Sequence, residues 1–288
     1  MLRRLLESLE RQTLPPASFE VVVVDNDPAG SARGIVAAFA AESAFRIEYR
    51  AHPDPNIAKA RNEGVRVARR RWLAFVDDDE WADPVWLESL LQTAEQRDCH
   101  AVLGPVLPEF PPGAPTWIVT GGFFERRRHR TGMAISCRDA RTGNALVSNA
   151  LRLELDLWFE PRLGRIGAED HHFFRRLANG GGRIVWCDEA TVHETVLRER
   201  LSRRWLLKWA FRGGQSYVLA QRLADGVPAA GLSVATGLLA FPGFLALGLV
   251  AYPFRPALGF RLLQRAAVQI GKVAILTPFR YRSYEPKP

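Results

Sequence analysis

The chain has 288 residues, of which 47% are hydrophobic and 24% charged, a composition that excludes general disorder. Its length allows one large domain or two modest ones. The 39 Lys and Arg residues exceed the 31 Asp and Glu residues, which gives a formal net charge of +8. The three cysteines are too few and too scattered for a disulfide framework or a zinc knuckle, and they fit a reduced, cytosolic environment. The N-terminal segment lacks the long apolar run and the small-residue cleavage site of a secretory signal.

The positive charge is concentrated in the last third of the chain. Residues 198–288 hold 14 Lys and Arg against three Asp and Glu, a net charge of +11, so residues 1–197 carry the remaining −3. A nucleic-acid-binding protein usually spreads its basic residues over its recognition domain. We therefore expect no nucleic-acid partner, and we expect the acidic body and the basic tail to have different partners.

The first hundred residues predict strands that alternate with helices. An amphipathic helix over 1–12 is indicated by the spacing of Leu2, Leu5, Leu6 and Leu9. Two apolar runs, 19–25 and 72–77, predict buried strands that end in an aspartate. The patterns between and after them predict helices over 31–43 and 56–69, a strand over 45–50 and a helix that starts near Pro84. This alternation predicts an α/β fold with a mainly parallel sheet, whose ligands bind outside the carboxyl ends of the strands.

The run Asp77-Asp78-Asp79-Glu80 follows the second of these strands. Adjacent carboxylates repel one another unless solvent or a divalent cation compensates them. Mg²⁺ and Mn²⁺ take oxygen ligands, commonly one or two carboxylates together with substrate phosphates. The run therefore indicates either a metal site or an acidic turn that caps the next helix.

Glu169 and Asp170 stand at the start of a predicted helix. Acids are favoured there by the helix dipole, so simple capping is one interpretation; the other is a general base. His171 and His172 are expected to be structural or exposed. His193 follows a predicted strand over 183–187; a lone histidine is more often structural than a ligand, but it could supply an imidazole to the same cation.

Residues 109–122 are rich in Pro and Gly and predict a loop or a crossover connection. A basic stretch follows, with Arg126, Arg127, Arg128 and Arg130. It is either a solvated loop or a mobile lid that contacts the acceptor.

The tail contains 28 uncharged residues, 227–254, which is more than the roughly 20 that a membrane-spanning helix needs. Pro242 and Pro253 interrupt this segment, and basic residues with interleaved aromatics flank it on both sides. Such flanks suit an anionic headgroup layer. Since both flanks are basic, the positive-inside rule does not orient a single span, which favours a re-entrant or in-plane segment. A buried helical hairpin in a soluble domain is the alternative.

Taken together, these motifs resemble the family 2 glycosyltransferases with the GT-A fold, over residues 1–215. The last two motifs are most similar to the bacterial exopolysaccharide subgroup, including succinoglycan-type glucosyltransferases. The matching segments, in family order and spacing, are VVVVDND (21–27), NIAKARNEGVRVA (56–68), FVDDDEWADPVWL (75–87), TGNAL (142–146), GAEDHHFFRRL (167–177) and VHETVLRERLSRRWLLKWAFRGG (192–214).

The resemblance implies a role for each matching residue. Asp170, with Glu169 beside it, would be the catalytic acid pair, and Asp170 would take the acceptor proton. The metal, Mg²⁺ or Mn²⁺, would be held by Asp79, with His193 near it or near the diphosphate. Arg198, Arg203 and Arg204 would contact a diphosphate or a lipid-phosphate acceptor. The nucleotide-sugar would be bound by Asp25, Asp27, Arg61, Asp77, Asp78 and Asn144.

The resemblance also implies an inverting transfer from a nucleotide-sugar, most commonly a UDP-sugar, to a lipid-linked or polysaccharide acceptor in cell-surface polysaccharide synthesis. We expect a Rossmann-like GT-A domain over 1–215 and a membrane-associated tail over 216–288. The expected place is the cytoplasmic face of the bacterial inner membrane.

The family begins with an apolar strand before its first helix, whereas this sequence opens inside that helix. We expect the sheet to lack that strand, because translation starts further upstream or because the gene is truncated. Two other functions stay open. A nucleotidyl or phosphoryl transferase would want a Gly-rich phosphate loop with a lysine, and we find none. A truncated, inactive homologue acting as a membrane-associated binding protein is the second.

Overall fold

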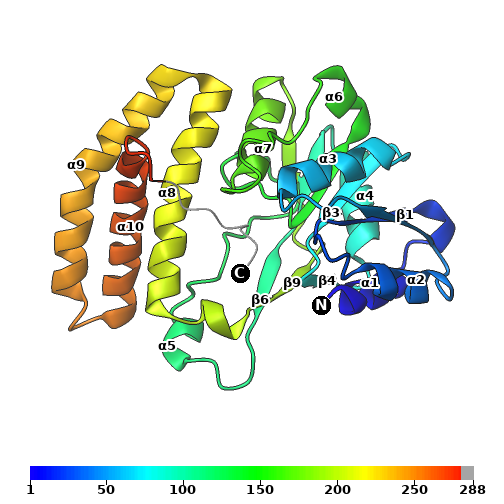
Figure 1. The fold of residues 1–288 in the computed structure, drawn as a ribbon, viewed down its shortest axis with the longest axis horizontal. Coiled ribbons are helices and arrows are strands. Elements are labelled where there is room, and N and C mark those ends of the chain that lie inside the picture. Colours follow the sequence, from blue (N-terminus) through cyan, green and yellow to red (C-terminus); the bar gives the residue numbers. More distant parts are fainter. Residues whose placement is uncertain (280–288) are drawn as a thin grey trace.

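The computed structural model describes residues 1–279, an α/β body followed by three long helices. The helices of the body are α1 (Leu2–Glu10), α2 (Arg33–Ala40), α3 (Ile57–Val67), α4 (Trp86–Gln96), α5 (Thr116–Val119), α6 (Asn149–Glu154) and α7 (Glu169–Asn179). Its strands are β1 (Glu20–Asp25), β2 (Arg46–Ala51), β3 (Trp72–Val76), β4 (Glu80–Ala82), β5 (Ala101–Leu103), β6 (Val106–Glu109), β7 (Asn144–Ser148), β8 (Ile184–Trp186) and β9 (Val192–Thr195). The helical tail consists of α8 (Arg203–Asp225), α9 (Val227–Ala251) and α10 (Pro256–Ala274), which stand side by side at one end of the molecule (Figure 1).

The strands of the body form three sheets. Their orders are β1-β2, β3-β7-β5-β8 and β4-β9-β6. Within residues 1–279, three of the six pairings are parallel and three are antiparallel. The α/β class is therefore confirmed, but the pairing is mixed where the sequence predicted a mainly parallel sheet. Two of the antiparallel pairings involve β7, which follows a long connection without a βαβ crossover, and the third joins β4 to β9.

The pair β1–β2 stands apart from the central sheet. Its parallel register runs from Glu20 opposite Arg46 to Asp25 opposite Ala51. In the part of the chain that the structure describes, no strand joins β1 to β3. The consequence is visible in burial, because β1 is half-buried up to its last residue, whereas β5 and β8 are buried throughout.

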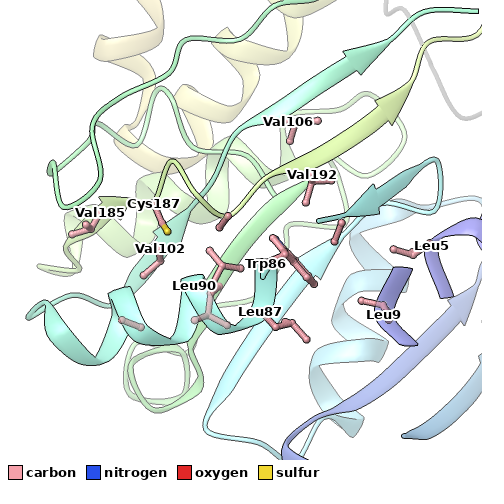
Figure 2. Close-up of a cluster of buried hydrophobic side chains, with 14 of the residues drawn as sticks. Leu5, Leu9, Trp86, Leu87, Leu90, Val102, Val106, Val185, Cys187 and Val192 are labelled. Atoms are coloured by element: carbon pink, nitrogen blue, oxygen red, sulfur yellow. The ribbon is translucent and has the colours of Figure 1, made fainter. Parts of the chain in front are cut away.

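Two apolar clusters cover the two faces of the central sheet. One places Trp86 and Leu90 of α4 against Val102 of β5 and Val185 of β8 (Figure 2). The other gathers Phe159 with side chains of α7, including Phe173 and Phe174. Strands β5 and β8 are therefore buried on both faces, which explains their continuous apolar sequence. Helix α7 is fixed by its buried face, and its first turn stays available for the site.

The tail helices pack closely on one another and on the body. Helix α8 contacts both α7 and α10, so the predicted boundary at residue 215 falls inside a helix that belongs to both regions. A Cβ on Gly214 would lie 2.1 Å from the carbonyl oxygen of Val268, which shows how closely α8 approaches α10. Helix α9 continues through Pro242, although the sequence predicted an interruption. Among the described helices, α9 is the one long and apolar enough to cross a membrane.

Candidate active site

Arg61 brings together two acidic motifs that are about 90 residues apart in the sequence. It lies on α3, and its Nη2 donates to Asp77 Oδ1 at 2.9 Å, directly after β3. Its Nη1 forms an ion pair with Glu169 Oε1 at the start of α7. The side chain of Arg61 is 12% exposed and that of Glu169 is 6% exposed, so the pair is screened little by solvent. A single guanidinium group therefore connects the acidic run after β3 to the acid pair of α7.

Glu169 lies buried at the first residue of α7, after Ala168 in the left-handed region with φ of 75°. Burial raises the pKa of its carboxyl to about 7, and Asp170 adds to that rise, whereas Arg61 opposes it. Its Oε2 has no hydrogen-bond partner among the described residues. Asp170 is half-buried, and its Oδ1 accepts from the backbone N–H of His171 at 2.6 Å. The site thus has a buried acid, Glu169, beside a more accessible one, Asp170.

His171 and His172 are structural, as the sequence predicted. Both are buried on α7. Burial, followed by the charge of Arg141, lowers the pKa of His171 to about 4, and burial also lowers the pKa of His172. Both imidazoles are therefore neutral at physiological pH.

Asp79 lies in a second group of charged side chains, which the sequence did not predict. Arg200 Nη2 is 3.3 Å from Asp79 Oδ2, and Arg200 Nη1 is 3.0 Å from Glu194 Oε1. Arg126, from the basic stretch after α5, reaches Glu194 Oε2 at 2.5 Å. Burial raises the pKa of Asp79 to about 6, and the carboxylates of Glu194 and Asp77 add to the rise. Burial also raises the pKa of Asp78 and of Glu80, in both cases with help from Asp77.

This donor set fits a divalent cation that takes few protein ligands. No group of three or more metal-ligating side chains occurs in residues 1–279. Mg²⁺ and Mn²⁺ sites on nucleotides, however, need only one or two carboxylates, because substrate phosphates complete the coordination. The acids after β3 are crowded enough to raise one another's pKa, and a guanidinium group already lies against Asp79. A cation at Asp79 would relieve the same repulsion.

The structure does not bring His193 to Asp79. Its ring stacks on Trp81 with centroids 5.3 Å apart. Its Nδ1 lies 3.1 Å from Glu109 Oε1, and its Nε2 lies 3.1 Å from Asp83 Oδ1. Successive side chains of a strand point to opposite faces, so in β9 it is Glu194 that faces the acidic run. The expected metal role of His193 therefore has no support from this geometry.

Asn144 lies in the core and not in a pocket. It is 2% exposed at the start of β7. Its Oδ1 accepts from Trp86 Nε1 at 2.8 Å, and its Nδ2 donates to the carbonyl oxygens of Pro105 and Ala190. All of its hydrogen-bonding atoms are engaged, so a structural role replaces the expected contact with the nucleotide-sugar.

Asp25 and Asp27 form the turn that follows β1, as predicted. Asp25 accepts from the backbone N–H groups of Asp27 and Ala32, both at 3.0 Å, and from Tyr49 Oη at 2.9 Å. A hydrogen bond from Ser31 lowers the pKa of Asp27. Helix α3, which carries Arg61, packs against β1, so the turn and the Arg61 contacts share one scaffold.

Of the basic residues near the tail, Arg200 pairs with Asp79 and Glu194. Arg198 donates to the carbonyl of Pro112, and Arg203 lies over the rings of Trp117 and Tyr252. The basic stretch 126–130 is held partly by acids, since Arg128 pairs with Asp188 as Arg126 does with Glu194. From the sequence, Arg200 could be recognised only as one of several basic residues in a row of arginines.

The sequence model for glycosyl transferase family 2 matches residues 1–148. The chain belongs to this family. The succinoglycan biosynthesis protein ExoM of Rhizobium meliloti (strain 1021) is 39% identical over 216 residues, which cover 74% of this chain and 68% of that protein. A validoxylamine A glucosyltransferase of Streptomyces hygroscopicus subsp. limoneus is 33% identical over 130 residues, which are 39% of this chain and 28% of that one. The family predicted from the motifs is confirmed.

Solved structures support the GT-A fold. A mannosyltransferase from Pyrobaculum calidifontis, in complex with GDP-Man and Mn²⁺, aligns with a TM-score of 0.61 at 17% identity, over 96% of this chain and 83% of that one. S. aureus TarS in complex with UDP-GlcNAc aligns with a TM-score of 0.54 at 18% identity, over 95% and 86% of the two chains. The body of this chain is therefore a family 2 glycosyltransferase with the GT-A fold.

Proposed function

We propose that the protein is an inverting, metal-dependent glycosyltransferase that moves a sugar from a nucleotide-sugar to an acceptor hydroxyl. The observation that carries this proposal is the contact of Arg61 with both Asp77 and Glu169. It joins the acids that would face the donor to the acids that would act on the acceptor. A capping turn or a purely structural ion pair would not require both motifs to meet at one guanidinium group.

The donor would lie along the carboxyl ends of β1 and β3. Asp25 and Asp27 would contact the base, and Asp77 and Asp78 would lie near the ribose and the phosphates. A uridine nucleotide is the first candidate, in keeping with the UDP-GlcNAc complex of TarS. Arg200 and Arg126 are the nearest cationic groups to Asp79 and Glu194 and would neutralise part of the diphosphate charge.

Asp79 would hold a Mg²⁺ or Mn²⁺ ion, which supplies positive charge where the leaving diphosphate develops negative charge. Asp170 would deprotonate the acceptor hydroxyl as that oxygen attacks the anomeric carbon. The buried Glu169, held by Arg61, would position the first turn of α7 and with it Asp170. A single displacement of this kind inverts the configuration of the anomeric carbon.

The tail would bind the protein to the cytoplasmic face of the inner membrane. Helix α9 exposes large apolar side chains, including Leu239 at 83% and Leu232 at 68% exposure. Helix α8, which carries several arginines, is fixed to the body through α7, so α9 would lie in the plane of the membrane beside it. The acceptor would be a lipid-linked saccharide, and the process exopolysaccharide synthesis, in keeping with the similarity to ExoM.

Donor hydrolysis tests the proposal. The full chain is incubated in lipid with a panel of nucleotide-sugars, with Mn²⁺ or Mg²⁺ and with or without EDTA. Release of nucleoside diphosphate that depends on the metal supports sugar transfer. Binding of a nucleotide-sugar without turnover, with every donor and metal, would indicate the non-catalytic homologue.

A further inference from the structure

A cavity outside the acidic site collects three arginines. It has a volume of about 420 Å³ and lies between the Gly122–Phe123 turn, α8 and α10. Its charged lining residues are Arg141, Arg261 and Arg265, and no acidic residue lines it among those described. Trp209, which is 45% exposed, and Val268 complete an apolar wall.

The three guanidinium groups have neutral partners in the structure. Arg261 donates to the carbonyl of Gly121, at 3.0 Å from Nε, and Arg141 donates to the carbonyls of Arg138 and Ala140. Arg265 lies over the ring of Phe244, 5.9 Å from its centroid. Within residues 1–279 none of the three forms an ion pair, although Glu125 lies near the same turn. Three cations that form no ion pair within residues 1–279, gathered in one concave site, favour an anion with several acceptor oxygens, and a phosphate matches the guanidinium fork.

The surroundings of the cavity favour an amphiphilic ligand, one with a charged end and an apolar end. Phe244 belongs to α9, so Arg265 extends from the cavity toward the helix that exposes its leucines. Trp209 offers an apolar ring with a polar edge, as residues at a membrane interface do. A ligand with a phosphate at one end and a hydrocarbon chain at the other would satisfy both parts.

One lining residue of the cavity, Arg141, is linked electrostatically to helix α7. The charge of Arg141 acts on His171, the residue after Asp170. His171 in turn lies against Tyr217 of α8, with ring centroids 5.5 Å apart. A headgroup held by Arg141 would therefore be close to the first turn of α7.

We propose that this cavity binds the phosphate of a phosphorylated lipid, with the hydrocarbon chain leaving along α10 and α9. This inference rests on the proposed function, since it gives the lipid-linked acceptor a site. The anchor is an ionic contact of the phosphate with Arg141, Arg261 and Arg265, and no covalent step is involved.

The test is co-sedimentation of the full chain with phosphatidylcholine vesicles that carry hexadecyl phosphate, hexadecanoate or hexadecanol. We expect tighter binding to the phosphate than to the carboxylate at equal surface charge. Arg265→Gln and Arg141→Gln should each weaken binding to the phosphate vesicles by roughly tenfold to hundredfold, because each removes a charge-assisted contact. Arg255→Gln is the matched control, an exposed arginine just before α10. This substitution should weaken binding to the phosphate vesicles by only about fivefold, which is the effect of one charge near an anionic surface.

Equal losses in the cavity variants and in Arg255→Gln would overturn the proposal, because they would indicate general attraction to the surface. An affinity for inorganic phosphate in solution equal to that for the phosphate vesicles would also overturn it, because the hydrocarbon chain would then contribute nothing to binding. Circular dichroism spectra of each variant exclude unfolding, and Arg265→Lys, which keeps the charge but not the fork, should lie in between. Donor hydrolysis is measured on the same samples. If the wild-type protein hydrolyses the donor but does not prefer the phosphate vesicles, the lipid-phosphate site is contradicted and the proposed function is not. If it prefers the phosphate vesicles but hydrolyses no donor, the proposed function is contradicted and the lipid-phosphate site is not.

Discussion

The acidic site and helix α9 of the tail differ in charge: the site is crowded with charged side chains, and α9 has none. In the site, carboxylates crowd after β3 and at the start of α7, and arginines from α3 and from the segment before α8 compensate them. In the tail, α9 has no charged residue, and five of its leucines are exposed to solvent. The comparison teaches that several acids of the site have arginine partners within the chain, whereas large apolar side chains of α9 are exposed to solvent. The predictions below test each side of this contrast.

The largest effect is expected for Asp170→Asn. Loss of general-base help should lower turnover by about 10²–10⁴-fold. The amide keeps an oxygen that can accept from the N–H of His171, so the fold should persist. Initial rates of sugar transfer measure the effect. Asp98→Asn, the same change at an exposed position outside the site, is the control, and equal rates for all three proteins would remove Asp170 from the mechanism.

Arg61→Ala should destabilise the body by about 3 kcal/mol at pH 8, because it leaves the buried Glu169 without its partner. The loss should shrink at pH 5, where Glu169 is protonated. Thermal or urea unfolding at both pH values measures it. Arg66→Ala, on the same helix but 67% exposed in its pair with Glu63, should cost less than about 1 kcal/mol. A similar cost for both substitutions would show that the Arg61 contacts are ordinary surface pairs.

Leu239→Gln should weaken binding to anionic vesicles by roughly tenfold to hundredfold, the value of one leucine buried in an apolar phase. The side chain is 83% exposed in the structure, so the substitution should leave the free energy of unfolding unchanged. Leu153→Gln makes the same change on α6 of the body, where the leucine is 63% exposed. If both variants pellet with vesicles as the wild type does, α9 is not the membrane-binding surface.

The last prediction concerns the dependence of stability on pH. Because burial raises the pKa of Glu169 from 4.5 to about 7, the folded state holds this proton where the unfolded chain has lost it. The stabilisation is complete below pH 4.5 and is lost as the pH rises toward 7, at no more than about 1.4 kcal/mol per pH unit. Asp79, with its pKa raised to about 6, contributes in the same direction. Melting temperatures from pH 5 to 8 should therefore fall, and Glu169→Gln should reduce the slope; an unchanged slope would exclude Glu169 as its source.

Local sequence patterns were sufficient to predict most helices and strands of the body and the positions of the two acidic motifs. Apolar spacing identified α1, α3, β1 and β3, and the ends of these strands correctly located Asp25 and Asp77. Contacts between residues far apart in the sequence could not be predicted from it. The pairing of Asp79 with Arg200 spans 121 residues, and no local signal distinguishes Arg200 from Arg198 or Arg203.

The register of β9 decides which side chains His193 contacts. The strand pairs with β4 so that Trp81 lies opposite His193 and Glu80 opposite Glu194. A shift of one residue would exchange the two faces, and the sequence of one strand does not reveal its register. The contacts of Asn144 could not be predicted for a related reason, because its three partners come from α4, the residues after β5 and the segment before β9.

The central claim, an inverting transfer that uses the acids around Arg61, is tested most directly by the configuration of the product. The full chain is given an α-linked nucleotide-sugar with Mn²⁺ in lipid, and proton NMR of the newly formed linkage reports the anomer. The account predicts a β-linked product, because a single displacement by the oxygen activated at Asp170 inverts the anomeric carbon. An α-linked product would contradict it.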